Sequence, residues 1–170
     1  FEGEFAEGTA LGSQGERREQ LVVLCPHTYM NASGKSVRKA CDFYKLVPSE
    51  VLVICDDLDL AAGRLRIRGS GSDGGQKGFA DIIRHLGTDE MVRLRLGIGR
   101  PPAGWETADY VLGKFNKQEV EIFESATTKA AHAALDWACE GVGFTMNRYN
   151  ADPAPKQKQT KKQTKKQKPL

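Results

Sequence analysis

Apolar residues follow two different periods along the chain, and each period predicts one type of element. The runs 21–25 (LVVLC) and 51–55 (VLVIC) are short and continuously apolar, and they are closed by Pro26 and by acidic residues, respectively. Runs of this length and composition are typical of strands buried in a sheet. The alternating segment 63–68 (GRLRIR) predicts a strand with one apolar and one solvated face, and 92–99 (VRLRLGIG) predicts another strand.

The helical period governs longer segments. Helices are expected at 34–46, 76–87 and 116–141, with a short helical turn at 108–115. Asn116 is a candidate cap for the long helix. The first eleven residues alternate poorly and end in a Gly-Ser-Gln-Gly turn at 12–15. Because strands alternate with helices, the sequence predicts a single α/β domain.

Composition is that of an ordinary globular domain. The 170 residues are 39% hydrophobic and 28% charged, and no stretch approaches the roughly 18 apolar residues of a transmembrane helix. The four cysteines include no C-x-x-C pair, which favours a reduced, cytosolic chain without a disulfide framework or a zinc site. Cys25 and Cys55 end apolar runs and are expected to be buried.

The net charge of +3 conceals a division of charge along the chain. Residues 156–170 contain 7 of the 25 basic residues and no acidic one, so the rest of the chain has 18 basic and 22 acidic residues. A segment of Lys, Gln and Thr cannot form a core, and we expect residues 151–170 to be a disordered basic tail. Its role stays open between a solubilising extension and non-specific contact with a phosphate backbone.

A second concentration of basic residues lies inside the predicted domain. Residues 64–100 contain 8 basic and 4 acidic residues. If strands 63–68 and 92–99 pair, their arginines can share one face, and a basic stripe on an acidic body favours phosphate recognition. A solvated sheet face of mixed charge is the alternative.

Between these strands lies a Gly-rich loop at 69–75 (GSGSDGG). It does not fit the P-loop pattern, because Lys77 stands between Gln76 and Gly78. It does not fit the dinucleotide fingerprint either, because it follows an alternating strand late in the chain. Two interpretations stay open: a flexible lid or connection, and a loop whose backbone approaches a ligand before a helix start that favours anions.

Two polar residues have positions that suit catalysis. Asp56 follows a strand at the edge of an α/β sheet where ligands bind, and it can orient a histidine, bind a metal or cap a turn. Asn31 precedes the helix at 34–46 and can either cap it or hold a substrate carbonyl or a water. None of the three histidines stands where catalysis requires one, although His27 is close to Asn31 in sequence.

Four stretches taken together resemble bacterial-type peptidyl-tRNA hydrolase in their residues, order and spacing. They are CPHTYMNASGKSV (25–37), VICDDLDLAAGRLRIRGSGSDGGQKGFADII (53–83), VRLRLGIGRPP (92–102) and YVLGKF (110–115). The resemblance covers about residues 1–150 and implies one α/β domain with a twisted mixed sheet flanked by helices. It also implies hydrolysis of the ester between a peptide and the 3′-terminal ribose of tRNA. We accordingly expect a cytoplasmic monomer that binds the acceptor stem and 3′ end of peptidyl-tRNA, with no membrane contact, cofactor or metal.

The resemblance implies roles for individual residues. Asp56 matches the Asp that orients the catalytic histidine, and Asn31 matches the Asn that contacts substrate and helps to position the water. The other implied residues are substrate-binding Tyr29, Met30, Gln76 and Lys77, and tRNA phosphate-binding Arg66, Arg68 and Arg95. Gln76 and Lys77 stand where the family usually has His-Asn. A Gln can still hydrogen-bond a peptide or ribose group, and a Lys adds a phosphate contact.

The chain departs from the family at its beginning. The family opens with a strand ending in Gly-Asn-Pro-Gly and a Thr-Arg-His-Asn stretch that carries the general base, and neither is present. We therefore expect that the first strand and its following helix are missing, that no base accompanies Asp56, and that this chain is a weak or inactive hydrolase. The alternatives are a non-catalytic RNA-binding relative of the splicing-factor type, and a nucleotide-phosphate-binding α/β enzyme, which rests on the Gly-rich loop alone.

Overall fold

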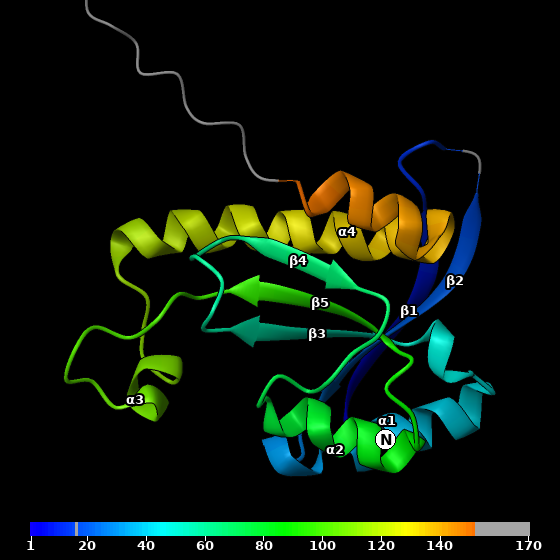
Figure 1. Cartoon of the computed structure of the whole chain (residues 1–170). Coiled ribbons are helices and arrows are strands. Elements are labelled where there is room, and N and C mark those ends of the chain that lie inside the picture. The colour runs from blue at the N-terminus through cyan, green and yellow to red at the C-terminus, as the bar shows by residue number, and fades with distance from the viewer. Residues whose placement is uncertain (16, 152–170) are drawn as a thin grey trace, which may run out of the picture.

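The structure is a computed structural model that describes residues 1–15 and 17–151 (Figure 1). In chain order its strands and helices are β1 (Gly3–Leu11), β2 (Arg18–Pro26), the 3-10 helix η1 (Met30–Ala32), α1 (Ser33–Tyr44), the 3-10 helix η2 (Pro48–Glu50), β3 (Leu52–Asp57), β4 (Leu65–Arg68), α2 (Lys77–Leu86), β5 (Val92–Gly97), α3 (Thr107–Val111) and α4 (Lys117–Tyr149). From residue 152 onward, the expected basic tail lies outside the described residues. None of the described helices is long and apolar enough to cross a membrane.

The central sheet has the order β3-β5-β4. β3 pairs with β5 in parallel, and β4 pairs with β5 in antiparallel orientation, so the sheet is mixed as expected. Parallel strands need a long crossover connection, and here β4 and α2 lie within the connection between β3 and β5. The carboxyl ends of β3 and β5 therefore lie at the same edge of the sheet.

Alternating side chains of β5 separate the two faces of this sheet. Leu94 is 0% exposed and packs in one core cluster with Ile67 of β4 and Ala133 of α4. On the opposite face, Phe79 of α2 packs with Met91 in a second cluster. Figure 1 shows α4 along one face of the sheet, with α1 and α2 on the other. The alternating strands and the amphipathic helices therefore meet in two cores, one on each side of the sheet.

The helix α4 begins as the sequence predicts and continues beyond its predicted end. The side chain of its cap, Asn116, accepts hydrogen bonds from the N–H groups of Gln118 (2.9 Å) and Glu119 (3.0 Å). The helix is interrupted by a kink at Gly141, which has a φ of 85°, and then continues to Tyr149. Glycine adopts this left-handed conformation without steric cost, so the residue that was expected to end the helix only bends it.

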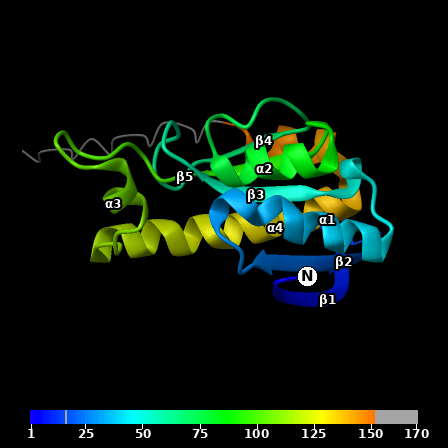
Figure 2. The same cartoon turned by 90° about the horizontal axis from the view of Figure 1, so that it is seen from below.

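A buried carboxylate on α4 connects that helix to the hairpin formed by β1 and β2. Asp136 is 2% exposed and accepts hydrogen bonds from the Ser13 N–H in the hairpin turn (3.0 Å) and from the Tyr149 hydroxyl (2.7 Å). Its Oδ2 also lies 3.2 Å from the Arg148 guanidinium. Burial raises the pKa of Asp136, but these partners outweigh burial and hold the pKa below its ordinary value. Figure 2 shows the hairpin set apart from the central sheet.

The first strands depart from their sequence pattern in two ways. Residues 3–11 form β1 although their own alternation is poor, because they pair along their whole length with β2. The apolar runs of β2 and β3 predict burial, yet Val23 is 58% and Ile54 is 53% exposed. Within the described residues each of these strands pairs along one edge only, and both line a groove of about 1210 Å³. Cys25 is accordingly exposed.

Replacing Gly34 by alanine is expected to lower the free energy of unfolding by roughly 1–3 kcal/mol. The added Cβ would lie 2.2 Å from the backbone oxygen of Asp81, so α1 and α2 must move apart. The measurement is urea-induced unfolding followed by circular dichroism. Gly143→Ala in α4 is the control, because a Cβ there meets no atom within 4 Å and alanine favours a helix by about 1 kcal/mol. Equal stability of the two variants would contradict the close packing of α1 on α2.

Candidate active site

Asp56 and Gln76 meet at the carboxyl end of β3. The Gln76 side-chain amide donates a hydrogen bond to Asp56 Oδ1 (3.3 Å). Its oxygen accepts hydrogen bonds from the N–H groups of Gly78 (2.8 Å) and Phe79 (3.3 Å), so Gln76 is also the N-cap of α2. One side chain therefore joins the end of β3 to the start of α2. The sequence carried no clear signal for this cap, because Gln is not among the residues that usually cap helices.

Met30 packs against the first turn of α2. A Cβ at Gly78 would lie 2.5 Å from Met30 Sδ, so glycine at this position permits the contact. Met30 Sδ also lies 4.0 Å from Gln76 Nε2, yet Met30 remains 59% exposed and the preceding Tyr29 is 87% exposed. A solvent-accessible apolar surface therefore adjoins the polar pair of Asp56 and Gln76, a combination typical of binding sites.

Asn31 does not cap α1. Ala32 occupies the N-cap position, and its side chain cannot accept a hydrogen bond from the helix. The neighbouring Ser33 hydroxyl donates to the Met30 carbonyl (3.0 Å). Asn31 is exposed, and its side chain has no hydrogen-bond partner among the residues that the structure describes. Of the two interpretations of this residue, the cap is wrong, and the amide is available to a ligand.

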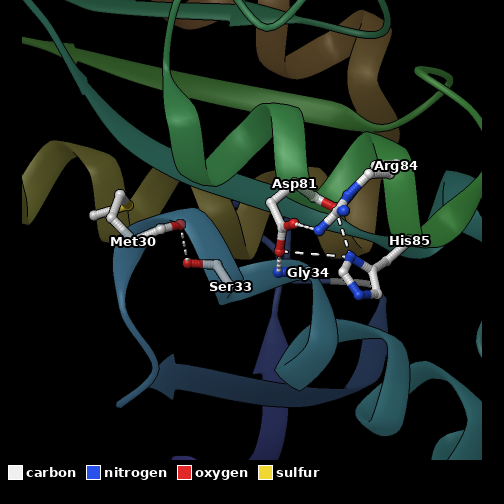
Figure 3. Close-up of polar contacts among 6 residues, drawn as sticks. All are labelled: Met30, Ser33, Gly34, Asp81, Arg84 and His85. Carbon is white, nitrogen blue, oxygen red and sulfur yellow. Dashed lines mark hydrogen bonds and ion pairs between the residues drawn. The ribbon is translucent and has the colours of Figure 1, made fainter.

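Asp81 supplies the acceptor that the start of α1 lacks. Its Oδ2 accepts a hydrogen bond from the Gly34 N–H (2.8 Å) across the contact of α1 with α2 (Figure 3). Arg84 donates to Oδ1, and His85 Nδ1 lies 3.5 Å from Oδ2. Burial raises the pKa of Asp81, but the hydrogen bonds from Arg84 and Gly34 outweigh burial and hold the pKa below its ordinary value. Sequence reasoning missed this residue, although an acid on the buried face of a helix was a usable signal.

The three histidines have other environments. His27 Nε2 lies 3.7 Å from the Glu4 carboxylate at the exposed hairpin. His85 contacts Asp81, and His132 is exposed on α4. In residues 1–15 and 17–151, no hydrogen bond or ion pair joins a histidine to Asp56. Among the described residues, Asp56 is therefore hydrogen-bonded to Gln76 and not to a histidine.

The arginines of β4 and β5 share one face of the sheet. Arg66 lies opposite Arg95, and Arg68 lies opposite Arg93, in the antiparallel register. Arg95 Nη1 forms an ion pair with Asp57 Oδ2 at 2.7 Å. Arg66 and Arg68 form no ion pair or hydrogen bond through their side chains with another described residue, so their charges are available to a ligand.

Arg93 has a role that sequence reasoning missed. It is 5% exposed, and it donates hydrogen bonds to the carbonyl oxygens of Gly71 and Ser72. Its guanidinium carbon lies 4.4 Å from the centroid of the Phe79 ring. Burial lowers the pKa of this guanidinium. Arg93 therefore anchors the Gly-rich loop (69–75) to the sheet instead of offering its charge to a ligand.

The groove between β2 and β3 extends to the candidate site. Its lining includes Met30, Asp56 and Gln76, and Lys77, which follows Gln76 at the start of α2, is exposed. No group of three His, Cys, Asp or Glu side chains that could hold a metal ion occurs in the described part of the chain. The arrangement offers a carboxylate, amides and an apolar surface at one sheet edge. Such groups can bind and orient a polar substrate with an apolar part.

Comparison with known proteins identifies one family. Residues 1–162 match the sequence pattern of the family described as peptidyl-tRNA hydrolase. A peptidyl-tRNA hydrolase of Rhodopirellula baltica is 58% identical over 151 residues, which cover 89% of this chain and 76% of that protein. One of Desulfitobacterium hafniense is 45% identical over 150 residues, which cover 88% and 78%. The crystal structure of peptidyl-tRNA hydrolase from Acinetobacter baumannii is similar with a TM-score of 0.73 at 32% identity, covering 88% of this chain and 73% of that one.

The four thiols are expected to react with iodoacetamide at different rates. Cys25 is exposed, whereas burial raises the pKa of Cys55, beside Asp56, to about 11, and Cys41 and Cys139 are buried. Because the thiolate is the reactive form, Cys25 should be labelled first at pH 8, and labelling of Cys55 should increase as the pH approaches 11. Mass spectrometry of each labelled site measures this order, with Cys25→Ser as the control that removes the fast phase. Fast labelling of Cys55 at pH 8 would contradict it.

Proposed function

Because the chain belongs to the peptidyl-tRNA hydrolase family, we propose that it binds peptidyl-tRNA and promotes hydrolysis of the ester between peptide and tRNA. The family's reaction is that of a carboxylic-ester hydrolase. The observation that carries the proposal is the meeting of Asp56, Gln76 and Met30 at the carboxyl end of β3, with Asn31 exposed next to Met30. Open α/β sheets bind their ligands at this edge.

The proposed reaction uses water as the nucleophile. Water adds to the ester carbonyl carbon while a base accepts a proton from the water. The bond between that carbon and the ribose oxygen then breaks, the protonated base gives its proton to the ribose oxygen, and the new carboxylic acid releases its proton to solvent. The products are a peptide with a free carboxylate and a tRNA with a free ribose hydroxyl. A base whose pKa is near the working pH is the most effective, and histidine is the usual one.

Asn31 and Asp56 have separate roles in this proposal. The exposed amide of Asn31 can donate to the ester carbonyl oxygen and accept from the water. Asp56 Oδ1 is held by Gln76, whereas Oδ2 has no hydrogen-bond partner among the described residues and can accept one from a histidine. Further contacts to the substrate are proposed for Tyr29, Met30, Gln76 and Lys77.

The rate of ester hydrolysis by this chain is proposed to be low, because none of its three histidines, all within the described residues, contacts Asp56. His27, His85 and His132 each have a setting away from Asp56: the Glu4 carboxylate, the Asp81 carboxylate and the exposed surface of α4. Without a general base, ester hydrolysis is slower by about 10²–10⁴-fold. We therefore propose that the 170-residue chain binds peptidyl-tRNA and hydrolyses it weakly.

The basic face of β4 and β5 is proposed to contact phosphates of the acceptor stem and 3′ end of tRNA. Arg66 and Arg68 have no ion pair with another described residue, and their charges are thus not offset by a neighbouring acid. Arg95 lies opposite Arg66 and is oriented by its ion pair with Asp57. Three cations on one sheet face favour a ligand with repeated negative charges, such as a nucleic-acid backbone, over a neutral ligand.

A second candidate function is binding of RNA without hydrolysis. The observation that favours it is the basic sheet face beside an Asp56 that no histidine of the described chain contacts. Binding and hydrolysis must therefore be measured separately. For either function we propose a monomer in the cytoplasm, where translation produces peptidyl-tRNA, and sedimentation equilibrium measures the oligomeric state.

Peptide release by this chain is expected to be about 10²–10⁴-fold slower than release by the Rhodopirellula relative, with the substrate still bound. Asp56→Ala is expected to lower the remaining rate by about tenfold, because it removes the acceptor that holds the Gln76 side-chain amide at the site. Release is followed by chromatography of the peptide and binding by filter retention. Asp59→Ala is the control, because Asp59 follows the same strand but is paired with Arg100 at 2.6 Å.

Each outcome of this measurement has a definite meaning. Release at the rate of the relative would contradict the proposal that no histidine of this chain acts as the base. His27→Ala would then be the next variant to measure. Binding without release in every variant would favour the second function. Failure to bind peptidyl-tRNA would contradict the proposed function itself.

Replacing Arg66 or Arg68 by alanine is expected to weaken tRNA binding and to reduce the salt dependence of log K by about 0.7–0.9 per removed phosphate contact. The measurement is the Kd between about 50 and 200 mM KCl. Arg38→Ala is the control, because Arg38 lies exposed on α1 and is paired with Asp42 at 2.9 Å. If the slope of Arg66→Ala and Arg68→Ala equals that of Arg38→Ala, this sheet face does not bind phosphate.

A further inference from the structure

We infer that Asp81 is a positioning residue of the candidate active site, because it fixes the segment that contains Met30 and Asn31 relative to the start of α2. The inference rests on the proposed function and deepens it. The Asp81 side chain is 4% exposed and lies in the interface of α1 with α2. It therefore acts through the backbone of α1 and not by touching the substrate.

Two contacts hold the segment 30–34 against one side of α2. Gly78 and Asp81 are three residues apart and lie on the same side of the helix. Gly78 lies against Met30, where a Cβ would be 2.5 Å from Sδ, and Asp81 Oδ2 accepts the Gly34 N–H at 2.8 Å. Figure 3 shows Met30 and Gly34 on the same connected segment beside α2. Asn31 lies between these two contacts along the chain, so both ends of its segment are fixed.

The contact at Gly34 brings two helix backbones together. A Cβ on Gly34 would lie 2.2 Å from the Asp81 carbonyl oxygen and 2.6 Å from His85 Nδ1. The first turn of α1 has no acidic residue and its N-cap position has no side-chain cap. Asp81 therefore supplies both a hydrogen-bond acceptor and a negative charge to this helix start. Loss of the carboxylate leaves the first turn of α1 free to shift, and Asn31 shifts with it.

The other partners of Asp81 belong to α2 itself. Arg84 donates to Oδ1, and its side chain is 72% exposed. His85 Nδ1 lies 2.9 Å from the Asp81 carbonyl oxygen and 3.5 Å from Oδ2. Among these partners, Gly34 alone belongs to another element. The hydrogen bond to Gly34, and not the ion pair with Arg84, is therefore expected to fix the segment.

Asp136 on α4 is a matched control for Asp81, because it separates an effect on the position of Met30 from an effect on the stability of the fold. Asp136 is also nearly buried, accepts a backbone N–H from another element (Ser13, 3.0 Å), and has a surface arginine as partner (Arg148, 3.2 Å). It belongs to the helix on the opposite face of the sheet (Figure 1). Loss of either carboxylate is expected to destabilise the fold, but only loss of Asp81 is expected to displace Met30.

The test follows the Met30 methyl signal by NMR in the 170-residue chain labelled with [13C-methyl]methionine. The chain has 3 methionines, and Met30→Leu assigns the signal. Asp81→Ala is expected to shift and broaden this signal, and Asp81→Asn to restore it, because an amide oxygen can accept the Gly34 N–H. Asp136→Ala and Arg84→Ala are expected to leave the signal unchanged.

A second readout connects this position to the proposed function. The probe is an acceptor-stem RNA that carries a peptide through a non-hydrolysable 3′-amide. Asp81→Ala is expected to weaken its binding on the order of tenfold, and to lower kcat of the residual hydrolysis more than it raises KM. Asp81→Asn should restore binding, and Asp136→Ala should bind as the unchanged chain does.

The outcomes separate the inference from the proposed function. An unmoved Met30 signal in Asp81→Ala, or an equal shift in Asp136→Ala, would overturn the inference, as would a shifted signal with unchanged binding. If the unchanged chain does not bind the RNA, the proposed function fails and the assignment of Asp81 to its site fails with it. If Asp81→Ala does not fold, Gly34→Ala replaces it, because it displaces the same contact and should shift the Met30 signal.

Discussion

β5 takes part in both ladders of the central sheet, and its alternating side chains determine where the candidate functional groups lie. Leu94 faces the core under α4, while Arg93 and Arg95 face the side of α2. Parallel pairing with β3 brings the ends of both strands to one edge, where Arg95 meets Asp57. A shift of the register by one residue would turn Arg93 into the apolar core, at a large desolvation cost. The amphipathic pattern therefore specifies the register strongly.

The candidate site depends on how two helix starts satisfy their free N–H groups. At α2 the acceptor is Gln76, which also donates to Asp56. At α1 the acceptor is Asp81, which belongs to another helix. Because Asp81 serves the start of α1, the amide of Asn31 is not used for capping. Structural hydrogen bonds thus orient the Gln76 amide toward Asp56 and leave the Asn31 amide exposed.

Like charges directly opposite each other on paired strands are destabilising, and the fold treats each arginine of β4 and β5 differently. Arg93 is buried under backbone carbonyls and an aromatic ring. Arg95 is paired with Asp57, which offsets part of the repulsion from Arg66 across the ladder. The charge that is left for a ligand is therefore concentrated on β4, a distribution that the count of basic residues in the sequence does not reveal.

The sequence by itself determined the elements whose pattern is local: the amphipathic helices, the alternating strand β4, the Asn116 cap and the four stretches that indicated the family. Only the tertiary structure decided the features that need a partner distant in the chain. β1 is a strand because β2 pairs with it, and Val23 and Ile54 are exposed because they line a groove that no other described element fills. The cap of α1 comes from Asp81, 47 residues beyond Gly34. A residue's period reports which side of an element is apolar, but burial and hydrogen bonding depend on which other element packs there.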